Sequence, residues 1–90
     1  MKAAYKKSFT KDLRNLQHHP AVLGDVRSVI EAVEAAESLR DVANCRKIKT
    51  AREDYYRIRI GDYRIGLCLD EDLVIFVRCL HRRDIYRYFP

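Results

Sequence analysis

The chain is poor in the residues that mark membrane, disulfide-rich and disordered proteins. Its 90 residues include three glycines, two prolines, three cysteines and no tryptophan. No apolar run approaches the roughly 20 residues of a membrane span, and residues 1–7 lack the apolar core of a signal peptide. With 48% hydrophobic and 34% charged residues, the chain is expected to fold as a single domain over residues 1–90. We therefore expect neither a transmembrane protein, nor a secreted precursor, nor a low-complexity tail.

The scarce cysteines and histidines also bear on redox and metal chemistry. An odd number of cysteines without a Cys-x-x-Cys spacing argues against a disulfide framework and favours a cytoplasmic protein. The histidines have no carboxylate at ligand spacing, so we expect no metal site and no cofactor. These residues are Cys45, Cys68, Cys79, His18, His19 and His81.

Positive charge is abundant by contrast. The formal net charge is +5 and the isoelectric point is about 9.3. Residues 1–45 carry a net charge of +1, and residues 46–90 carry +4. The expected partners are polyanions, either nucleic acid or an acidic protein, because a positive field attracts both. A basic domain that is merely soluble is the alternative.

Helical periodicity dominates the first half, after a short expected strand over residues 2–7. Phe9, Leu13 and Leu16 share one face of a helix that Ser8 or Thr10 can cap. Pro20 suits the first turn of a second helix, whose core stripe is Val22, Val26, Val29, Ile30, Val33 and Ala36. The short joint predicts an antiparallel helix hairpin, and residues 38–44 are its expected exit loop.

From Cys45 onward the apolar period changes to two, which indicates strands. The expected strands are residues 46–49, 55–60, 63–69 and 73–80, with turns over 50–54, 61–62 and 70–72. Residues 81–90 read as a basic, aromatic tail.

The hairpin turn at Gly61-Asp62 determines which side chains face each other. A two-residue type II′ turn places Ile60 opposite Tyr63 on the core face and Arg59 opposite Arg64 on the other. A three-residue turn over 70–72 would bring Arg78 opposite Arg64. Three arginines side by side destabilise a sheet slightly but form a cradle for phosphate, because guanidinium groups donate paired hydrogen bonds. Arginines that simply splay into water are the alternative.

Residues 55–66, YYRIRIGDYRIG, and residues 81–87, HRRDIYR, resemble the RelE/ParE superfamily of toxins, and the RelE branch most of all. The resemblance covers essentially the whole chain. It implies an α+β fold of the order β-α-α-β-β-β-β, with a two-helix hairpin on one face of a twisted, mostly antiparallel sheet and a basic groove on the other. It further implies a type II toxin that cleaves mRNA in the ribosomal A site, and a RelB-like antitoxin as partner.

By position, the resemblance assigns the family's sheet cations to Arg57, Arg59 and Arg64, and its C-terminal pair to Arg82 and Tyr86. Cleavage by a 2′-hydroxyl needs a base, an acid and cations that stabilise the transition state. His81 is the best-placed titratable group, unless it merely ends the strand. The expected catalytic set is Arg59, Arg64, His81, Arg82 and Tyr86.

Other cations are expected to hold the backbone of mRNA or ribosomal RNA, and two aromatic rings to stack on bases. The expected RNA-binding cations are Lys47, Lys49, Arg57, Arg78, Arg83 and Arg87. The rings are Tyr55 and Phe76, which the expected register places on the groove side. The equal alternative for both rings is packing at the edge of the sheet. Two other functions use the same fold: a ParE-like inhibitor of DNA gyrase without cleavage chemistry, and an inactive relative that binds only antitoxin or RNA. No membrane partner is expected.

Overall fold

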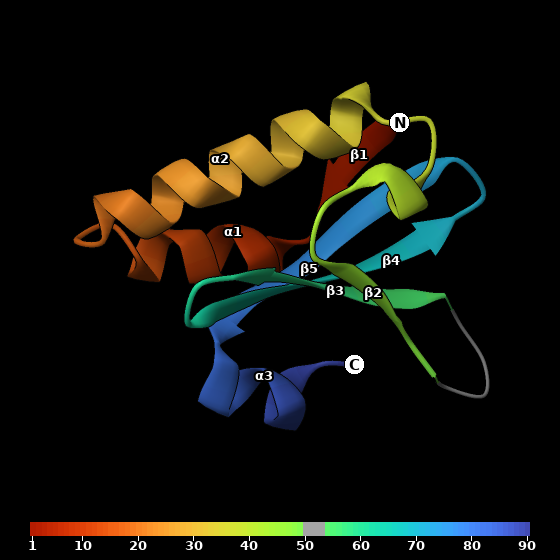
Figure 1. Cartoon of the computed structure of the whole chain (residues 1–90). Helices are drawn as coiled ribbons and strands as arrows, with labels where there is room; N and C mark the ends of the chain where they lie inside the picture. Colours follow the sequence, from red (N-terminus) through yellow and green to blue (C-terminus); the bar gives the residue numbers. More distant parts are fainter. Residues whose placement is uncertain (50–53) are drawn as a thin grey trace.

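The computed structural model describes residues 1–49 and 54–90 and shows a five-stranded sheet with helices on both sides (Figure 1). Its elements are β1 (Lys2–Tyr5), α1 (Lys7–Asn15), α2 (Pro20–Ala35), a 3-10 helix (Leu39–Asp41), β2 (Cys45–Ile48), β3 (Tyr55–Ile60), β4 (Tyr63–Asp70), β5 (Leu73–His81) and α3 (Arg82–Tyr88). The expected α+β class is confirmed, and α3 is an addition to it. Among the described residues, no helix has both the length and the apolar character that crossing a membrane requires.

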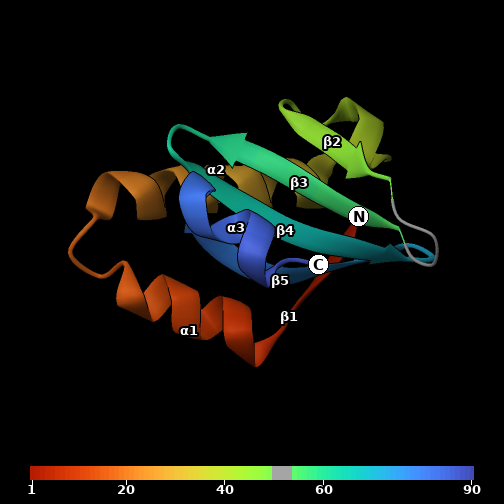
Figure 2. The ribbon, with the colours of Figure 1, turned by 90° about the horizontal axis from the view of Figure 1, so that it is seen from below.

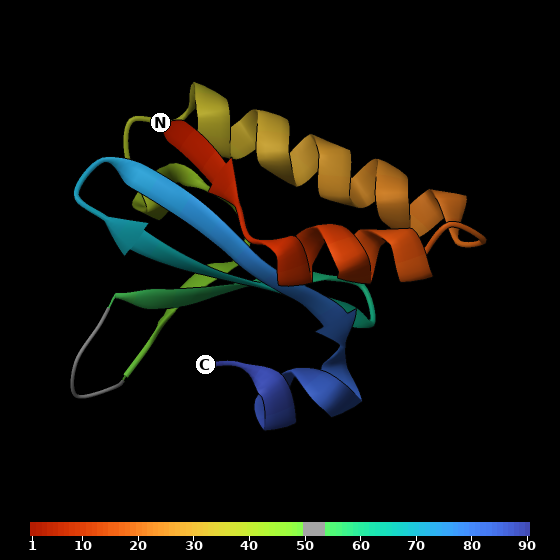
Figure 3. The same cartoon turned by 180° about the vertical axis from the view of Figure 1, so that it is seen from behind.

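The strands lie in the order β1-β5-β4-β3-β2. β1 runs parallel to β5, and the other neighbours are antiparallel. Helices α1 and α2 lie on one side of the sheet and α3 on the other (Figures 1 and 3). In the view from below, α3 lies directly across the sheet (Figure 2). Each sheet face therefore has a different helical neighbour, and we call them the α1/α2 face and the α3 face.

The hydrophobic core fills the α1/α2 face. Ile58 of β3 and Ile65 and Leu67 of β4 are buried there, because alternate residues of a strand point to the same side. Phe76 of β5 is fully buried beneath Phe9 of α1, with ring centroids 5.3 Å apart. The expectation that Phe76 faces the groove was therefore wrong: its ring belongs to the core.

Helix α1 begins at Lys7, ahead of its expected caps Ser8 and Thr10. Lys6 is its N-cap, without a capping side chain, and the Ser8 hydroxyl instead donates to the Val77 carbonyl, 2.6 Å away. Ser8 therefore ties α1 to β5. α2 begins at Pro20 and buries Val26 and Val33.

The β3–β4 register agrees with the prediction. Ile60 pairs with Tyr63 and Arg59 with Arg64. Gly61 has a φ of 59°, the positive value that the first central position of a type II′ turn needs. The turn residues therefore predict this hairpin correctly.

The β4–β5 register differs from the prediction. Asp70 pairs with Leu73, so the turn has two residues rather than three, and Glu71 takes a φ of 54°. A β-bulge follows, in which Val77 has no partner and Arg78 lies opposite Gly66 instead of Arg64. With this short turn, an unbroken ladder would place Arg78 on the core face. The bulge moves Arg78 back to the α3 face. In the prediction, the three-residue turn placed Arg78 on that face.

The C-terminal residues form a helix rather than an extended tail. The His81 Nδ1 atom accepts a hydrogen bond from the Arg83 N–H at 3.2 Å, which caps α3. Ile85 is fully buried, and Phe89 covers Gly66 so closely that a Cβ there would lie 2.6 Å from its ring. Glycine at position 66 thus allows the end of the chain to pack directly on β4.

The loop between α2 and β2 is also more ordered than expected. The 3-10 helix Leu39–Asp41 occupies it, and Leu39 and Val42 join the core. Of the expected turn over 50–54, residues 50–53 lie outside the described part of the chain.

Candidate functional site: an arginine cleft

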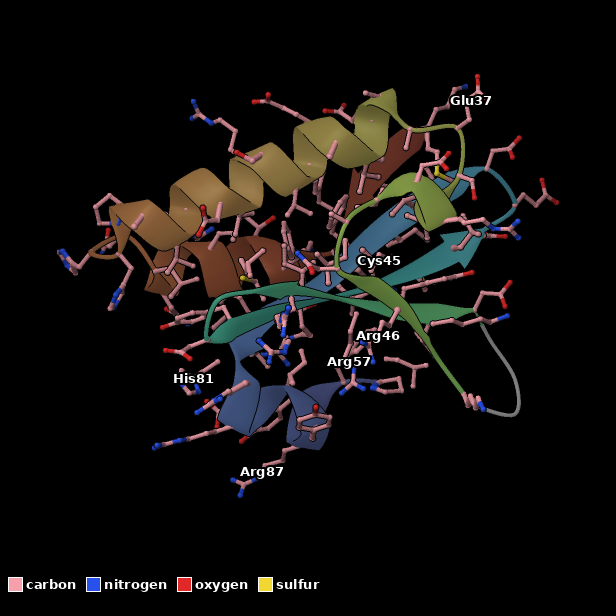
Figure 4. The ribbon with its side chains drawn as sticks, viewed as in Figure 1. Glu37, Cys45, Arg46, Arg57, His81 and Arg87 are labelled. Carbon is pink, nitrogen blue, oxygen red and sulfur yellow. The ribbon has the colours of Figure 1, made fainter. Side chains whose placement is uncertain are left out.

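A cleft of about 280 Å³ lies on the α3 face, between the sheet and α3. Strands β2, β3 and β4 supply its cations, and α3 supplies one aromatic ring. Its lining residues are Asn44, Arg46, Arg57, Arg59, Arg64 and Tyr86. Figure 4 shows Arg46 and Arg57 extending from the sheet into the space beside α3. We call this set the arginine cleft.

Strand alternation explains why the arginines gather there. In β3, Ile58 points into the core, so Arg57 and Arg59 point to the α3 face. The register places Arg46 of β2 opposite Arg57, and Arg64 of β4 opposite Arg59. Each directly opposed like-charged pair destabilises a sheet by about 0.2–1 kcal/mol. Among the residues that the structure describes, no carboxylate lines the cleft, so an anionic ligand is the natural means of neutralising it.

Tyr86 closes the cleft from the side of α3. The Arg57 guanidinium carbon lies 4.5 Å from the centroid of the Tyr86 ring, which is a cation–π contact. The tyrosine nevertheless remains 69% exposed. Its ring therefore orients Arg57 while its outer surface stays accessible to a ligand.

Arg64 is oriented by the hairpin turn. Its Nη1 atom donates to the Gly61 carbonyl at 2.8 Å and to the Tyr63 carbonyl at 2.9 Å. Arg82 contacts the same turn from α3, because its N–H donates to the Asp62 carbonyl at 2.8 Å and its guanidinium lies 4.0 Å from the Asp62 carboxylate. The turn thus links one cation of the cleft to the first residue of α3.

Two of the expected catalytic residues, His81 and Arg82, do not line the cleft. His81 caps α3, and its ring packs edge-on against Tyr63 with centroids 5.5 Å apart. Figure 4 shows His81 where β5 meets α3. Arg59, Arg64 and Tyr86 do meet in the cleft, so the structure brings together three of the five.

Arg78 does not join Arg59 and Arg64, so the predicted row of three arginines was wrong. Its guanidinium makes two hydrogen bonds to the Asp12 carboxylate, at 2.7 and 3.0 Å, and these hydrogen bonds raise the pKa of Arg78. Asp12, which is 5% exposed, also accepts from the Cys79 N–H at 3.0 Å. Arg78 lies 5.6 Å from the Tyr88 ring as well. It therefore connects α1, β5 and α3.

The remaining expected RNA contacts are scattered. Lys47 points to the α1/α2 face, since it pairs with Tyr56, and it forms a 3.0 Å ion pair with Asp54 that raises its pKa. Lys49, Arg83 and Arg87 are exposed, and Arg87 points away from the sheet (Figure 4). Tyr55 packs edge-on against Phe89, with ring centroids 5.3 Å apart.

Sequence reasoning missed Arg46 and Asn44. The neighbouring Lys47 was expected in the groove, whereas β2 turns Arg46 toward it. Asn44 has a φ of 61°, and its carbonyl accepts from the Arg59 N–H at 3.2 Å. An Asn just before a strand tolerates this left-handed backbone, which was the one local signal. No group of three potential metal ligands occurs among the residues described.

Comparison with known proteins identifies the family of the chain. A family model described as the ParE toxin of type II toxin–antitoxin systems matches residues 3–86. The chain belongs to this toxin family. The resemblance to the RelE/ParE superfamily seen in residues 55–66 and 81–87 is thereby confirmed.

Its relatives place the toxin near the RelE branch. Toxin RelE3 of Methanocaldococcus jannaschii is 42% identical over 91 residues and is matched over 100% of both chains. In the solved RelB–RelE antitoxin–toxin complex of Methanococcus jannaschii, one chain is 39% identical, with a TM-score of 0.78 and coverage of 97% of this toxin and 99% of that chain. The YoeB dimer of Staphylococcus aureus shares the fold at 13% identity, with a TM-score of 0.73 over 90% of this chain and 95% of its own.

Proposed function

We propose that this toxin is a ribosome-dependent endoribonuclease that cleaves mRNA in the ribosomal A site and so arrests translation in the cytoplasm. The observation that carries the proposal is the pair of opposed arginine pairs, Arg46 with Arg57 and Arg59 with Arg64, gathered around one cleft. Such pairs lower the stability of the sheet. They are useful, however, for stabilising the negative charge of a phosphate in its transition state. The 42% identity to a RelE toxin supports the same conclusion.

The reaction we propose is an internal transfer at one phosphate of the mRNA. The 2′-hydroxyl oxygen forms a bond to phosphorus and gives its proton to a base, while the bond from phosphorus to the 5′-oxygen breaks. The departing 5′-oxygen takes a proton from an acid, and a 2′,3′-cyclic phosphate remains. Negative charge grows on the phosphate oxygens in the transition state, where preorganised cations stabilise it most.

The cleft suggests a role for each lining side chain. Arg59 and Arg64 are proposed to stabilise the developing charge, and Arg46 and Arg57 to hold the flanking phosphates. Among the described residues that line the cleft, Tyr86 is the one with a hydroxyl group, so we assign it to proton transfer at the leaving oxygen. His81 and Arg82, at the start of α3, remain proposed contributors beside the Gly61-Asp62 turn.

The ribosome is proposed to complete the site. The cleft is lined by arginines, an asparagine and one tyrosine, and arginine is too basic to accept a proton. Binding in the A site would hold the mRNA phosphate in line with its 2′-hydroxyl, and such positioning is worth about 7–11 kcal/mol in favourable cases. Lys49, Arg83 and Arg87 are proposed to contact RNA around the cleft.

The antitoxin partner is proposed to be RelB-like. The chain belongs to a family of type II toxins, and a 39% identical chain was solved in a RelB–RelE antitoxin–toxin complex. A basic protein with an open arginine cleft is a suitable target for an acidic segment of such an antitoxin.

A purified translation system tests the proposed reaction. Ribosomes are stalled with a chosen codon in the A site, toxin is added, and the mRNA 5′ ends are mapped by primer extension. Wild-type toxin should cut within the A-site codon only when ribosomes are present. Arg59→Ala should lower the rate by about 10²–10³, as loss of one preorganised donor typically does. Arg27→Ala, an exposed arginine on α2, is the matched control and should cleave normally.

Intact mRNA with unimpaired translation would contradict the proposal. In that case a DNA supercoiling assay with gyrase decides whether the toxin acts as a ParE-like inhibitor, in keeping with the description of its family model. Antitoxin binding without either effect would identify an inactive relative.

A further inference from the structure

The outer edge of β5 changes its partner along the strand. β1 pairs with it as far as Phe76. Beyond that point the Ser8 hydroxyl of α1 donates to the Val77 carbonyl at 2.6 Å. One turn later, the Asp12 carboxylate accepts from the Cys79 N–H at 3.0 Å. Because residues four positions apart are neighbours on a helix, one face of α1 continues the hydrogen bonding of β1 along β5.

Asp12 also binds a side chain of β5. It is 5% exposed, and among the described residues it is the one charged side chain that is buried. Its two oxygens accept from the Nε and Nη2 atoms of Arg78, at 2.7 and 3.0 Å. A planar guanidinium held by two parallel hydrogen bonds has a fixed orientation. Asp12 therefore determines where the end of the Arg78 side chain lies.

Arg78 extends this contact to α3. The bulge in β5 places Arg78 opposite Gly66 on the α3 face, and its guanidinium carbon lies 5.6 Å from the centroid of the Tyr88 ring, a cation–π contact. Tyr88 is the last residue of α3. Since α1 and α3 lie on opposite sides of the sheet (Figure 3), Arg78 joins two helices that the sheet separates.

The position of α3 matters because this helix completes the arginine cleft. It has seven residues, and a helix this short is not stable by itself in water. His81 caps its start, while the buried Phe89 and the contact of Tyr88 with β5 hold its end. Tyr86 is 69% exposed, so its own packing does little to fix it. Its place over Arg57 therefore depends on how α3 is held.

We propose that Asp12 and Arg78 are positioning residues for RNA cleavage: the pair fixes the end of α3, and α3 holds Tyr86 in the arginine cleft. The inference rests on the proposed function, because it gives the pair a part in that reaction. The cleft is lined by other residues, so the pair acts through Tyr86. The arginines that hold phosphate stay in place, so the effect falls on kcat and not on KM for ribosomes.

Cleavage on stalled ribosomes tests the inference with two variants of α1. Asp12→Asn keeps the shape of the side chain but turns an amide NH₂, which cannot accept, toward a donor. Its kcat should fall about tenfold, within the roughly 10²-fold loss that a misplacement of about 1 Å can cause, with KM unchanged. Ser8→Ala removes the other side-chain bond from α1 to β5 and is the matched control, with the kcat of the wild type.

Tyr88→Leu tests the same contact from the side of α3. Tyr88 is 53% exposed, so this variant keeps the buried pair and the fold, and its kcat should fall about as far as that of Asp12→Asn. Asp12→Asn/Tyr88→Leu should lose no more than either single variant, because effects that pass through one contact are not additive. In a Tyr86→Ala background, Asp12→Asn should cause no further loss. A further tenfold loss there would overturn the inference.

A measurement without RNA separates this inference from the proposed function. The Tyr86 ring shields the Arg57 side chain, so NMR of isotope-labelled toxin should show the Arg57 Hε proton at a lower chemical shift than exposed arginines. In Asp12→Asn, but not in Ser8→Ala, this resonance should move toward theirs. A fall in kcat with an unmoved resonance would contradict the inference, because the loss would not pass through Tyr86.

Two outcomes distinguish the inference from the function on which it rests. If the wild type cleaves on ribosomes and Asp12→Asn has the same kcat, the inference is wrong and the proposed function stands. If the wild type does not cleave on ribosomes, the proposed function is wrong and the inference fails with it.

Discussion

The two faces of β3 and β4 belong to the same strands but affect the stability of the fold in opposite ways. On the α1/α2 face, Ile58, Ile65 and Leu67 are buried and hold the fold together. On the α3 face, Arg59 lies directly opposite Arg64 in an arrangement that opposes folding. Alternate residues of one strand therefore contribute to stability and to the proposed activity separately. A substitution on one face should leave the other property nearly intact, and the following experiments test how far that separation extends.

The largest effect is expected from the core. Phe76→Ala should lower the free energy of unfolding by about 3–5 kcal/mol, because it empties a fully buried site. Chemical denaturation followed by circular dichroism measures the change. At temperatures where the variant remains folded, its kcat on ribosomes should be close to wild type. A large loss of kcat in the folded variant would show that the two faces are coupled.

A smaller effect should follow from removing one oxygen in the arginine cleft. Tyr86→Phe keeps the ring over Arg57 but removes the hydroxyl, so cleavage should slow by about 10²-fold, the lower range for loss of an acid–base group. The free energy of unfolding should hardly change, since the tyrosine is 69% exposed. Single-turnover cleavage on stalled ribosomes measures the rate. If Tyr86→Phe cleaves at the wild-type rate, the hydroxyl is not needed for proton transfer and only the aromatic ring contributes to cleavage.

Alkaline pH should lower the free energy of unfolding through Cys79, a buried thiol of the core. Burial, followed by the nearby Asp12 carboxylate, raises the pKa of Cys79 from 9.0 to about 12. Below pH 9 the thiol is protonated in both states and its effect is nil. Above pH 9 the unfolded chain loses the proton first, so stability should fall by about 1 kcal/mol between pH 9 and pH 10 for this group. Denaturation at pH 8 and pH 10 should show a smaller fall in Cys79→Ala than in wild type.

The smallest effect is expected from His81, where β5 ends and α3 begins. Asn is a good N-cap, so His81→Asn should preserve α3 and reduce cleavage less than tenfold, since the imidazole caps the helix and packs on Tyr63. His81→Ala should destabilise the protein by about 1 kcal/mol through loss of the cap. Cleavage rates against pH compare the variants. Loss of activity in His81→Asn, together with a changed pH profile, would return His81 to the catalytic set.

Local sequence signals predicted part of the fold well. Strict alternation over Tyr55–Ile60 and a glycine in the following turn defined β3 and its register with β4. The β4–β5 register failed because a bulge at Val77, rather than a longer turn, keeps Arg78 out of the core. A bulge leaves no periodic signature in a short strand. α3 was missed for a similar reason: a segment of seven residues, six of them polar or aromatic, becomes a helix because Ile85 and Phe89 are buried against the rest of the fold.

The candidate site was predicted where strand register was certain. Arg57, Arg59 and Arg64 follow from one hairpin, and they do line the cleft. Arg46 and Lys47 are adjacent cations in a strand of four residues, and alternation alone does not tell which of them faces the ligand. Arg78 was misplaced because its partner, Asp12, is 66 positions away in the sequence. Long-range ion pairs of this kind are decided by tertiary packing.

The parallel pairing of β1 with β5 has a consequence for synthesis of the toxin. β5 contacts α1 as well, through the bond from Ser8 to Val77 across 69 positions. The first strand and helix therefore have no docking site until the last strand has left the ribosome, and such distant contacts form late. α3, which completes the arginine cleft, follows later still. A half-made chain therefore lacks both the contacts of β5 and the complete cleft, so the proposed activity requires synthesis of the chain through α3.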